Sequence, residues 1–202
     1  MVAITAILAG LQPQAVAAAA LVWWLLVAAE IPVFWPQTDE PVFRAANGLA
    51  GLATLAPALA LLVVLVRDHP WEALTVLVAV WAADIGAYAV GRLWGHHRMA
   101  PHISPGKTWE GLLGGTVLGA VAAGAMAWGR PELGAVPVLA GAGAAVALMG
   151  QVGDLSESMF KRRAGRKDSG RFLPGHGGIL DRIDSLTAAV PLYVLFLRGA
   201  GL

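Results

Sequence analysis

Residues 71–95 read WEALTVLVAVWAADIGAYAVGRLWG, an apolar run long enough to cross a bilayer as one helix. Five further windows have the same character, so we expect six spans. They are roughly residues 14–35, 46–66, 71–95, 111–129, 135–153 and 185–200. The sequence therefore predicts an all-α fold, a polytopic integral membrane helix bundle with about six transmembrane helices and two functional cytoplasmic loops.

The composition supports this class. Of the 202 residues, 57% are hydrophobic and 13% are charged, whereas a soluble domain carries about 25% charged residues. The absence of cysteine excludes disulfides and thiolate metal sites, and a net charge of +1 excludes simple electrostatic binding of nucleic acid. We expect one transmembrane domain, residues 1–202, with N-terminal spans in 1–83, a more polar region in 84–184 and the last span in 185–202.

The basic residues indicate an orientation. Six spans place segments 36–45, 92–110 and 154–184 on one side of the membrane. Eleven of the 14 Lys and Arg residues lie in these segments, and three (Arg67, Arg130 and Arg198) lie on the other side. The positive-inside rule therefore predicts that the first side is cytoplasmic.

The segment 153–184 reads GDLSESMFKRRAGRKDSGRFLPGHGGILDRID and interleaves carboxylates with cations. On a helix, Asp154, Glu157, Ser158 and Lys161 share one face, and Asp181 and Asp184 lie one turn apart. Carboxylates suit Mg²⁺, which binds one or two of them plus substrate phosphates. Lys and Arg can hold phosphate oxygens. A basic cluster beside a span can also be only a topology determinant or an anionic-lipid contact, and Asp181 can be only a helix cap.

An aspartate stands inside the third predicted span. Asp84 at a helix centre costs about 2.5–3.5 kcal/mol on insertion scales, so it is expected to face a polar cavity or a partner. Tyr88 follows one turn later on the same face. A purely structural hydrogen bond between helices is the alternative.

The loop SPGKTWEG, residues 104–111, combines a turn, a cation, a hydroxyl and a carboxylate just before a span. Its candidate substrate-binding residues are Ser104, Lys107, Thr108 and Glu110. Thr108 can equally be a helix N-cap. Nearby histidines match no standard metal-site spacing.

These motifs resemble the phosphatidate cytidylyltransferases, or CDP-diacylglycerol synthases. The family signature is similar to Ser158-Met159-Phe160-Lys161-Arg162, Lys167-Asp168, His176-Gly177-Gly178 and Asp181-Arg182-Ile183-Asp184. Its upstream elements are similar to Gly153-Asp154 and to Asp84, Ala87, Tyr88 and Gly91. Together the matches cover residues 84–184.

Two departures from the family pattern are visible. The loop that usually reads Ser-Pro-Lys-Lys-Thr has Gly106 in place of the first Lys, so one phosphate contact is missing or supplied elsewhere. The chain is also shorter than typical members, and we expect N-terminal spans to account for the difference.

The resemblance implies transfer of a cytidylyl group from CTP to phosphatidate, with release of pyrophosphate. It implies Mg²⁺ bound by Asp154 and Asp181. Asp184 would be a third ligand or would contact the groups that bind the ion. A second, monovalent cation such as K⁺ can share the site. Lys161, Arg162, Lys167 and Arg171 would neutralise the phosphates, and Lys107, Thr108 and Glu110 would complete the pocket. The remaining implied contacts with the substrates are Asp84, Tyr88, Ser104, Ser158, Asp168, His176, Gly177, Gly178 and Arg182.

The expected partners are CTP, phosphatidate and membrane lipids, without nucleic acid; a homodimer is compatible with the sequence. The expected location is the bacterial inner membrane, with the site facing the cytoplasm. Three alternatives are open: an enzyme acting on another lipid phosphate or a CTP-dependent polyprenol kinase, a transporter that uses Asp84, and a non-catalytic scaffold for anionic lipids.

Overall fold

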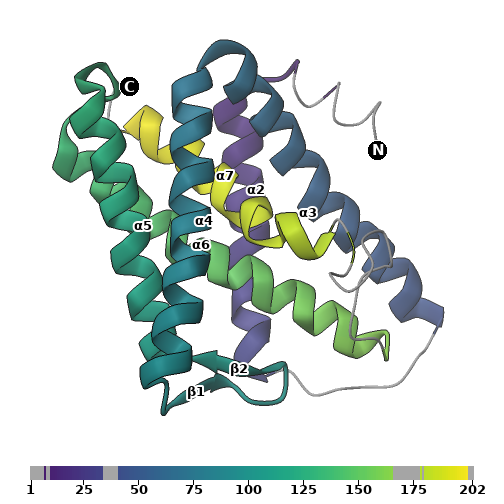
Figure 1. Cartoon of the computed structure of the whole chain (residues 1–202). Coiled ribbons are helices and arrows are strands. Elements are labelled where there is room, and N and C mark those ends of the chain that lie inside the picture. The colour runs from purple at the N-terminus through teal and green to yellow at the C-terminus, as the bar shows by residue number, and fades with distance from the viewer. Residues whose placement is uncertain (1–6, 8–9, 34–40, 166–177, 179, 200–202) are drawn as a thin grey trace.

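Helices make up almost all of the fold, which we describe from a computed structural model covering residues 7, 10–33, 41–165, 178 and 180–199. The long helices are α2 (Pro13–Glu30), α3 (Pro41–Asp68), α4 (Pro70–Trp94), α5 (Trp109–Gly129), α6 (Val136–Arg163) and α7 (Leu180–Gly199). Short 3₁₀ helices η1 (Ile31–Val33) and η2 (Pro131–Leu133) follow α2 and α5. The predicted helix bundle is confirmed (Figure 1).

Five of these helices, α2 to α6, are long and apolar enough to cross a membrane. They expose large apolar side chains that lipid can cover, such as Val63, Leu113 and Trp128. The sixth predicted span corresponds to α7, which is helical but carries charged residues in its first turns. Neighbouring helices cover its middle, where Ala189 and Val190 are buried, so α7 needs less apolar surface than a lipid-facing helix.

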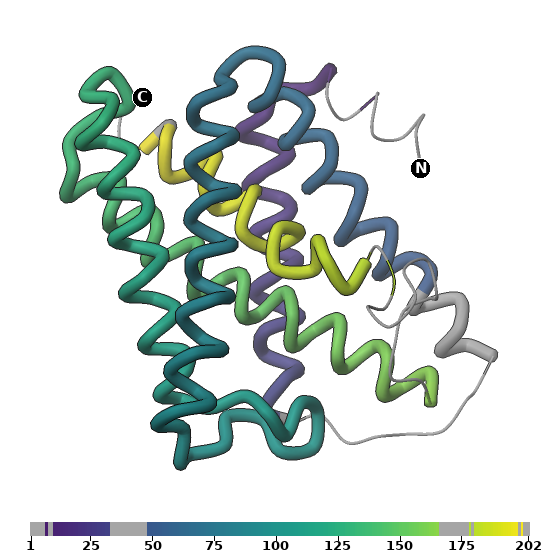
Figure 2. Tube along the Cα trace, in the orientation of Figure 1, coloured from purple at the N-terminus to yellow at the C-terminus, as the bar shows by residue number. Residues whose placement is uncertain are grey.

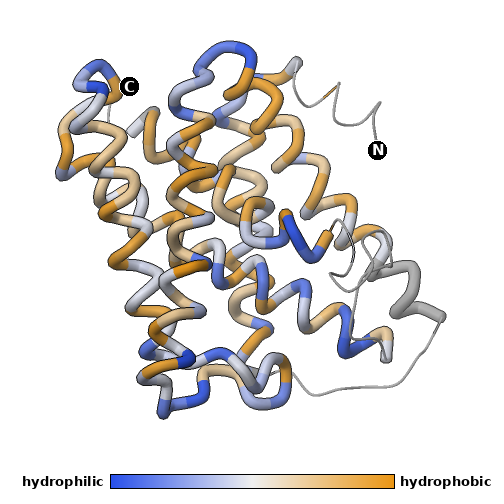
Figure 3. The backbone as a smooth tube through the Cα atoms, viewed as in Figure 1, coloured by the Kyte–Doolittle hydropathy of each residue, from blue (hydrophilic) through white to orange (hydrophobic). Residues whose placement is uncertain are grey.

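The helix ends sort into two groups. The end of α2, the hairpin after α4 and the end of α6 lie at one end of the bundle, and the α3–α4 and α5–α6 turns lie at the other (Figure 1). The described cations at the first end include Arg98, Lys107 and Arg163, whereas Arg67 and Arg130 lie at the second. This separation agrees with the predicted sidedness of the loops. Hydrophilic segments gather along the hairpin, the second half of α6 and the first turns of α7 (Figure 3).

Small residues bring the helices close together, as the Gly-rich spans suggested. A Cβ atom on Gly115 of α5 would lie 2.7 Å from the Ala83 carbonyl oxygen of α4. A Cβ on Gly143 of α6 would meet the Gly119 carbonyl oxygen of α5. Without side chains at these positions, backbones can approach to van der Waals contact. These two contacts place α5 between α4 and α6, in close contact with both.

Strands β1 (Arg98–Ala100) and β2 (Ser104–Thr108) form an antiparallel hairpin where the sequence predicted only a loop. Arg98 pairs with Thr108 and Ala100 with Ser104. The Thr108 hydroxyl then accepts a hydrogen bond from the Gly111 amide at 3.1 Å and caps α5. The N-cap interpretation of Thr108 is therefore confirmed, and the hairpin leads directly into the helix.

Candidate active site

The β1–β2 hairpin is held against α6. Ala100 and Ile103 pack in one buried cluster with Leu155 and Met159 of α6 and with Trp24 of α2. The Arg162 side chain of α6 also donates from Nε to the Ile103 carbonyl oxygen at 3.2 Å. The loop residues of the hairpin are thus fixed beside the part of α6 that carries Asp154.

Helices α6 and α7 approach each other closely at Gly153. A Cβ atom on Gly153 would collide with the Asp184 carbonyl oxygen of α7. Helix α7 runs back along α6 in the opposite direction (Figure 2). Because only glycine allows this approach, the residue directly after it, Asp154, lies beside the first turns of α7.

A polar cavity of about 500 Å³ opens between the hairpin and helices α4, α6 and α7. Four carboxylates and two lysines line it, drawn from segments up to a hundred residues apart. They are Asp84, Asp154, Asp181, Asp184, Lys107 and Lys161. The cavity also includes Tyr88, Ser104 and Thr108, so it gathers most of the described residues that the sequence singled out.

Two lysines neutralise part of this negative charge. Lys107 Nζ lies 2.6 Å from Asp154 Oδ2, and 14% of the Lys107 side chain is exposed. Lys161 Nζ lies 2.7 Å from Asp181 Oδ1 and also contacts the buried Glu157 one turn before it on α6. Four cavity carboxylates and Glu157 therefore face two ammonium groups. Among the described residues at the cavity, carboxyl groups thus outnumber ammonium groups.

The position of Asp181 depends on the start of α7. Its Oδ2 atom accepts a hydrogen bond from the Gly178 amide at 2.6 Å, while Oδ1 meets Lys161. The carboxylate therefore both orders the start of the helix and faces the cavity. The cap interpretation and the site interpretation of Asp181 are compatible.

Asp84 faces the polar cavity from α4. Its Oδ1 atom lies 3.5 Å from the Ser185 hydroxyl of α7, which donates to it. Tyr88, one turn further along α4, is 68% exposed and lies within 3.5 Å of the Arg92 guanidinium. The expected cavity and the alternative of a hydrogen bond between helices are therefore both present at Asp84.

Five described candidates, Gly178 among them, lie outside the polar cavity, and their substrate contacts stay predictions. Glu110 binds the backbone amide of His97 at 3.2 Å and its Nδ1 atom at 2.5 Å, which ties the start of α5 to the hairpin. The others are Ser158, Arg162 and Arg182. Gly178 contacts the cavity only through Asp181. Lys167, Asp168, Arg171, His176 and Gly177 lie outside the described residues.

Helical spacing predicted Glu157 on the face of Asp154 and Lys161, and it contacts Lys161. Two polar residues that line the cavity were not among the sequence candidates, Gln151 and Ser185. Gln151 lies one turn before Asp154, so the same spacing could have indicated it. Ser185 follows Asp184 but belongs to the site only because α7 packs against α4. No local signal in the sequence reveals that contact.

The carboxylates suit a hard cation by their chemistry. Within the described ranges, no three His, Asp or Glu residues are already arranged as a metal-binding group. A cationic ammonium group, that of Lys107, is nevertheless bound to Asp154. The carboxylate donor atoms therefore fit a divalent cation, which would take the place of the Lys107 ammonium beside Asp154.

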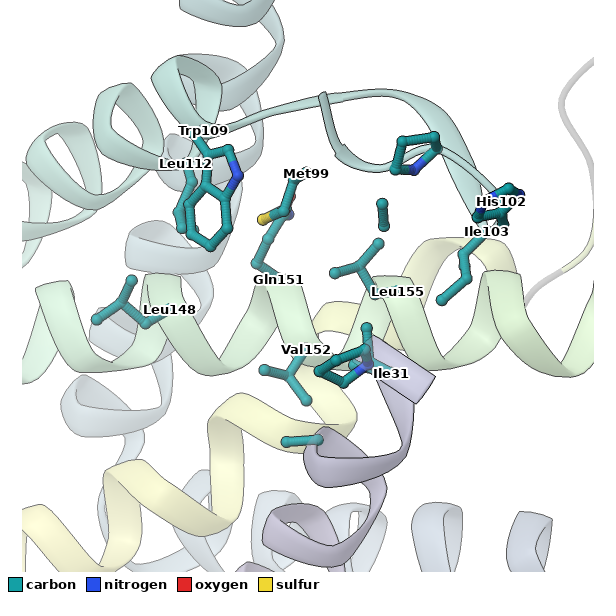
Figure 4. A pocket seen from close by; sticks show the side chains of 14 residues that line it. Ile31, Met99, His102, Ile103, Trp109, Leu112, Leu148, Gln151, Val152 and Leu155 are labelled. Carbon is teal, nitrogen blue, oxygen red and sulfur yellow. The ribbon is translucent and has the colours of Figure 1, made fainter. Parts of the chain in front are cut away.

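A second cavity, of about 470 Å³, lies on the other side of the hairpin and is lined mainly by apolar side chains. Met99 and Ile103 extend from the hairpin toward Leu148 and Leu155 of α6, with Ile31 below them (Figure 4). Leu112 and Gln151 line both cavities. An apolar space of this size therefore adjoins the charged one directly.

The chain was compared with known proteins. The model of the cytidylyltransferase family matches residues 2–199. A phosphatidate cytidylyltransferase from Pseudomonas aeruginosa is 42% identical over 186 residues, which cover 90% of this chain and 68% of the relative. One from Haemophilus influenzae is 40% identical over 197 residues, with 88% and 66% covered.

A shorter match extends to Staphylococcus aureus. Its phosphatidate cytidylyltransferase is 48% identical over 118 residues, which cover 58% of this chain and 45% of the relative. The chain therefore spans about two thirds of the length of the first two relatives and about half of the third.

Proposed function

The chain belongs to the cytidylyltransferase family, as the motifs predicted, and we propose that it joins CTP to phosphatidate to form CDP-diacylglycerol and pyrophosphate. The relatives named phosphatidate cytidylyltransferase in the comparison are bacterial proteins. The observation that carries the proposal is the pair of adjoining cavities, one charged and one apolar. A substrate with a phosphate head and acyl chains has this same division.

The acceptor is already a nucleophile. A phosphatidate phosphate oxygen attacks the α-phosphorus of CTP, a new P–O bond forms, and the bond to the β-phosphate oxygen breaks as pyrophosphate leaves. A phosphate dianion needs no general base to act in this step. The protein therefore contributes mainly alignment of the two substrates and stabilisation of charge on the phosphoryl oxygens.

Asp154, Asp181 and Asp184 would hold Mg²⁺. When bound, the ion offsets negative charge on the phosphates and helps to align them. The ammonium now paired with Asp154, that of Lys107, would be released toward a phosphate oxygen. Lys161 keeps its position between Asp181 and Glu157 and presents a second positive charge to the cavity. A second, monovalent cation is part of the same proposal.

The lipid half of the reaction uses the apolar cavity. Acyl chains would lie between the hairpin and α6, among Met99, Ile103 and Leu155. The lining is about as apolar as lipid tails, so the chains can pass from the bilayer into this cavity without leaving an apolar environment. The phosphate head would then reach the charged cavity past Leu112, while CTP enters from the hairpin end of the bundle. We propose that this end faces the cytoplasm of a bacterial cell.

The test is release of pyrophosphate by purified protein in detergent with CTP, phosphatidate and Mg²⁺. We expect release only with both substrates, loss of release on chelation of the metal, and a fall of at least about 100-fold for Asp181→Asn. Asp68→Asn is the matched control, because Asp68 pairs with Arg67 at the opposite end of the bundle.

Release that Asp181→Asn does not diminish would overturn the site assignment. No release with phosphatidate or other lipid phosphates, together with no binding of CTP, would overturn the reaction. A CTP-dependent polyprenol kinase would release CDP in place of pyrophosphate. A scaffold for anionic lipids would then explain the basic residues.

A further inference from the structure

Gln151 stands at the boundary between the two cavities. Its side chain lines both the charged cavity and the apolar one. Among the described residues, only Gln151 and Leu112 line both cavities. Figure 4 shows it on the face of α6 that points toward the hairpin, between Leu148 and Leu155. A polar amide thus occupies the passage between a charged space and an apolar one.

An amide within a spanning helix needs a partner. Leaving such a group unpaired in an apolar environment costs about 1–3 kcal/mol in proteins. Within the described part of the chain, the structure gives the Gln151 amide no hydrogen bond, and the side chain is only partly buried. Its donors and its acceptor are therefore available to a molecule that occupies the passage.

The position of Gln151 along α6 selects the chemical group it would meet. It precedes Asp154 by three residues, so it lies about 4.5 Å further along the helix from the charged site, toward the membrane interior. In a phosphatidate, the glycerol carbons and the two ester groups lie directly between the phosphate and the acyl chains. A lipid with its phosphate in the charged cavity and its chains in the apolar one brings an ester group to Gln151.

We propose that the Gln151 side-chain amide donates a hydrogen bond to an ester carbonyl oxygen of the lipid, and that Gln151 thereby selects diacyl over dialkyl phosphatidates. This inference rests on the proposed function and adds the linkage chemistry that the site accepts. An ether linkage has the same chain length but no carbonyl oxygen. Such a lipid would leave the amide unpaired, and sites built around a hydrogen bond discriminate against ligands that lack it.

The experiment compares kcat/KM for a diacyl and a dialkyl phosphatidate of equal chain length, at saturating CTP. The variants are Gln151→Met, which keeps the length of the side chain, and Gln151→Leu. Thr116→Val is the matched control. It removes a polar group from another spanning helix, where the Thr116 hydroxyl bonds only its own helix through the Leu112 carbonyl oxygen.

We expect the unaltered protein to prefer the diacyl lipid by about three- to tenfold, the range of one net hydrogen bond. Both Gln151 variants should lose this preference through a lower kcat/KM for the diacyl lipid alone, with KM for CTP unchanged. Thr116→Val should keep the preference.

Three results would overturn the inference. They are an unaltered protein that does not distinguish the two lipids, variants that retain its preference, and variants that lose activity equally with both lipids. The last result would assign Gln151 a structural role only. In each of these cases pyrophosphate release by the unaltered protein still supports the proposed function, whereas absence of release with every lipid overturns both.

Discussion

The two cavities on either side of the hairpin have nearly the same volume and opposite chemistry. The charged cavity, about 500 Å³, takes its charged side chains from β2, α4, α6 and α7. The apolar cavity, about 470 Å³, is lined largely by aliphatic and aromatic side chains, from α2 and the hairpin as well as α5 and α6. Helices α5 and α6 line both cavities, with Leu112 and Gln151 shared between them. An amphipathic substrate can therefore be held between these helices and their neighbours.

The largest effect is expected from removal of a charge in the charged cavity. Asp154→Asn would keep the shape of the side chain but remove the partner of Lys107 and one proposed metal ligand. We expect kcat to fall by about 10²- to 10³-fold, the scale for loss of one group that stabilises transition-state charge. The measurement is pyrophosphate release at saturating substrates.

The matched control is Glu30→Gln. Glu30 also pairs with a cation, the Arg163 guanidinium at 2.8 Å, but lines neither cavity. Its kcat should stay within about twofold of the unaltered protein, since exposed ion pairs contribute about 0–1 kcal/mol. If kcat of Glu30→Gln falls as far as kcat of Asp154→Asn, then activity depends on charged residues throughout this end of the bundle and not on the cavity in particular.

The contact that brings α6 to α7 can be tested with a methyl group. Gly153→Ala would place a Cβ against the Asp184 carbonyl oxygen, so we expect a loss of about 1–3 kcal/mol in stability and a lower kcat. Gly150→Ala, one turn earlier, is the control, because its Cβ would find its nearest neighbour at 3.4 Å. Thermal unfolding in detergent and pyrophosphate release measure the two effects. Equal behaviour of the variants would contradict the close approach.

A bulky side chain in the apolar cavity should affect the lipid and spare the nucleotide. Leu148→Trp would fill part of the space beside Gln151, and we expect kcat/KM for long-chain phosphatidate to fall about fivefold, near 1 kcal/mol. Short-chain lipids should be less affected, and KM for CTP should not change. Val117→Trp, on a lipid-facing part of α5, is the control. An equal effect on CTP would show that the cavities do not act separately.

The smallest effect is expected from an added charge at Gly106. This residue lines the charged cavity, and a Cβ there would meet nothing within 4 Å, so a side chain fits. Gly106→Lys should lower KM for CTP about two- to fivefold, while the uncharged Gly106→Gln should not. Steady-state kinetics at varied CTP separates the two variants. A higher KM for Gly106→Lys would mean that CTP does not approach this strand.

Much of the fold and part of the site were predictable. The spans follow from composition, because the bilayer imposes its thickness on each helix separately. Asp154 and Lys161, or Asp181 and Asp184, could be grouped because helical spacing places them on one face. The hairpin was missed, since the short segment of β1 and β2 carries no long alternating pattern. The apolar cavity was missed because its walls come from four parts of the chain.

By itself, the sequence determined that this is a membrane helix bundle, which of its segments share a side, and which family its motifs belong to. All three depend on local composition or on residues close together along the chain. Only the tertiary structure decided that Lys107 pairs with Asp154, that Ser185 reaches Asp84 and that Gln151 divides two cavities. These contacts join distant segments, and they form because helices packed through glycines such as Gly153 bring those segments within reach of one another.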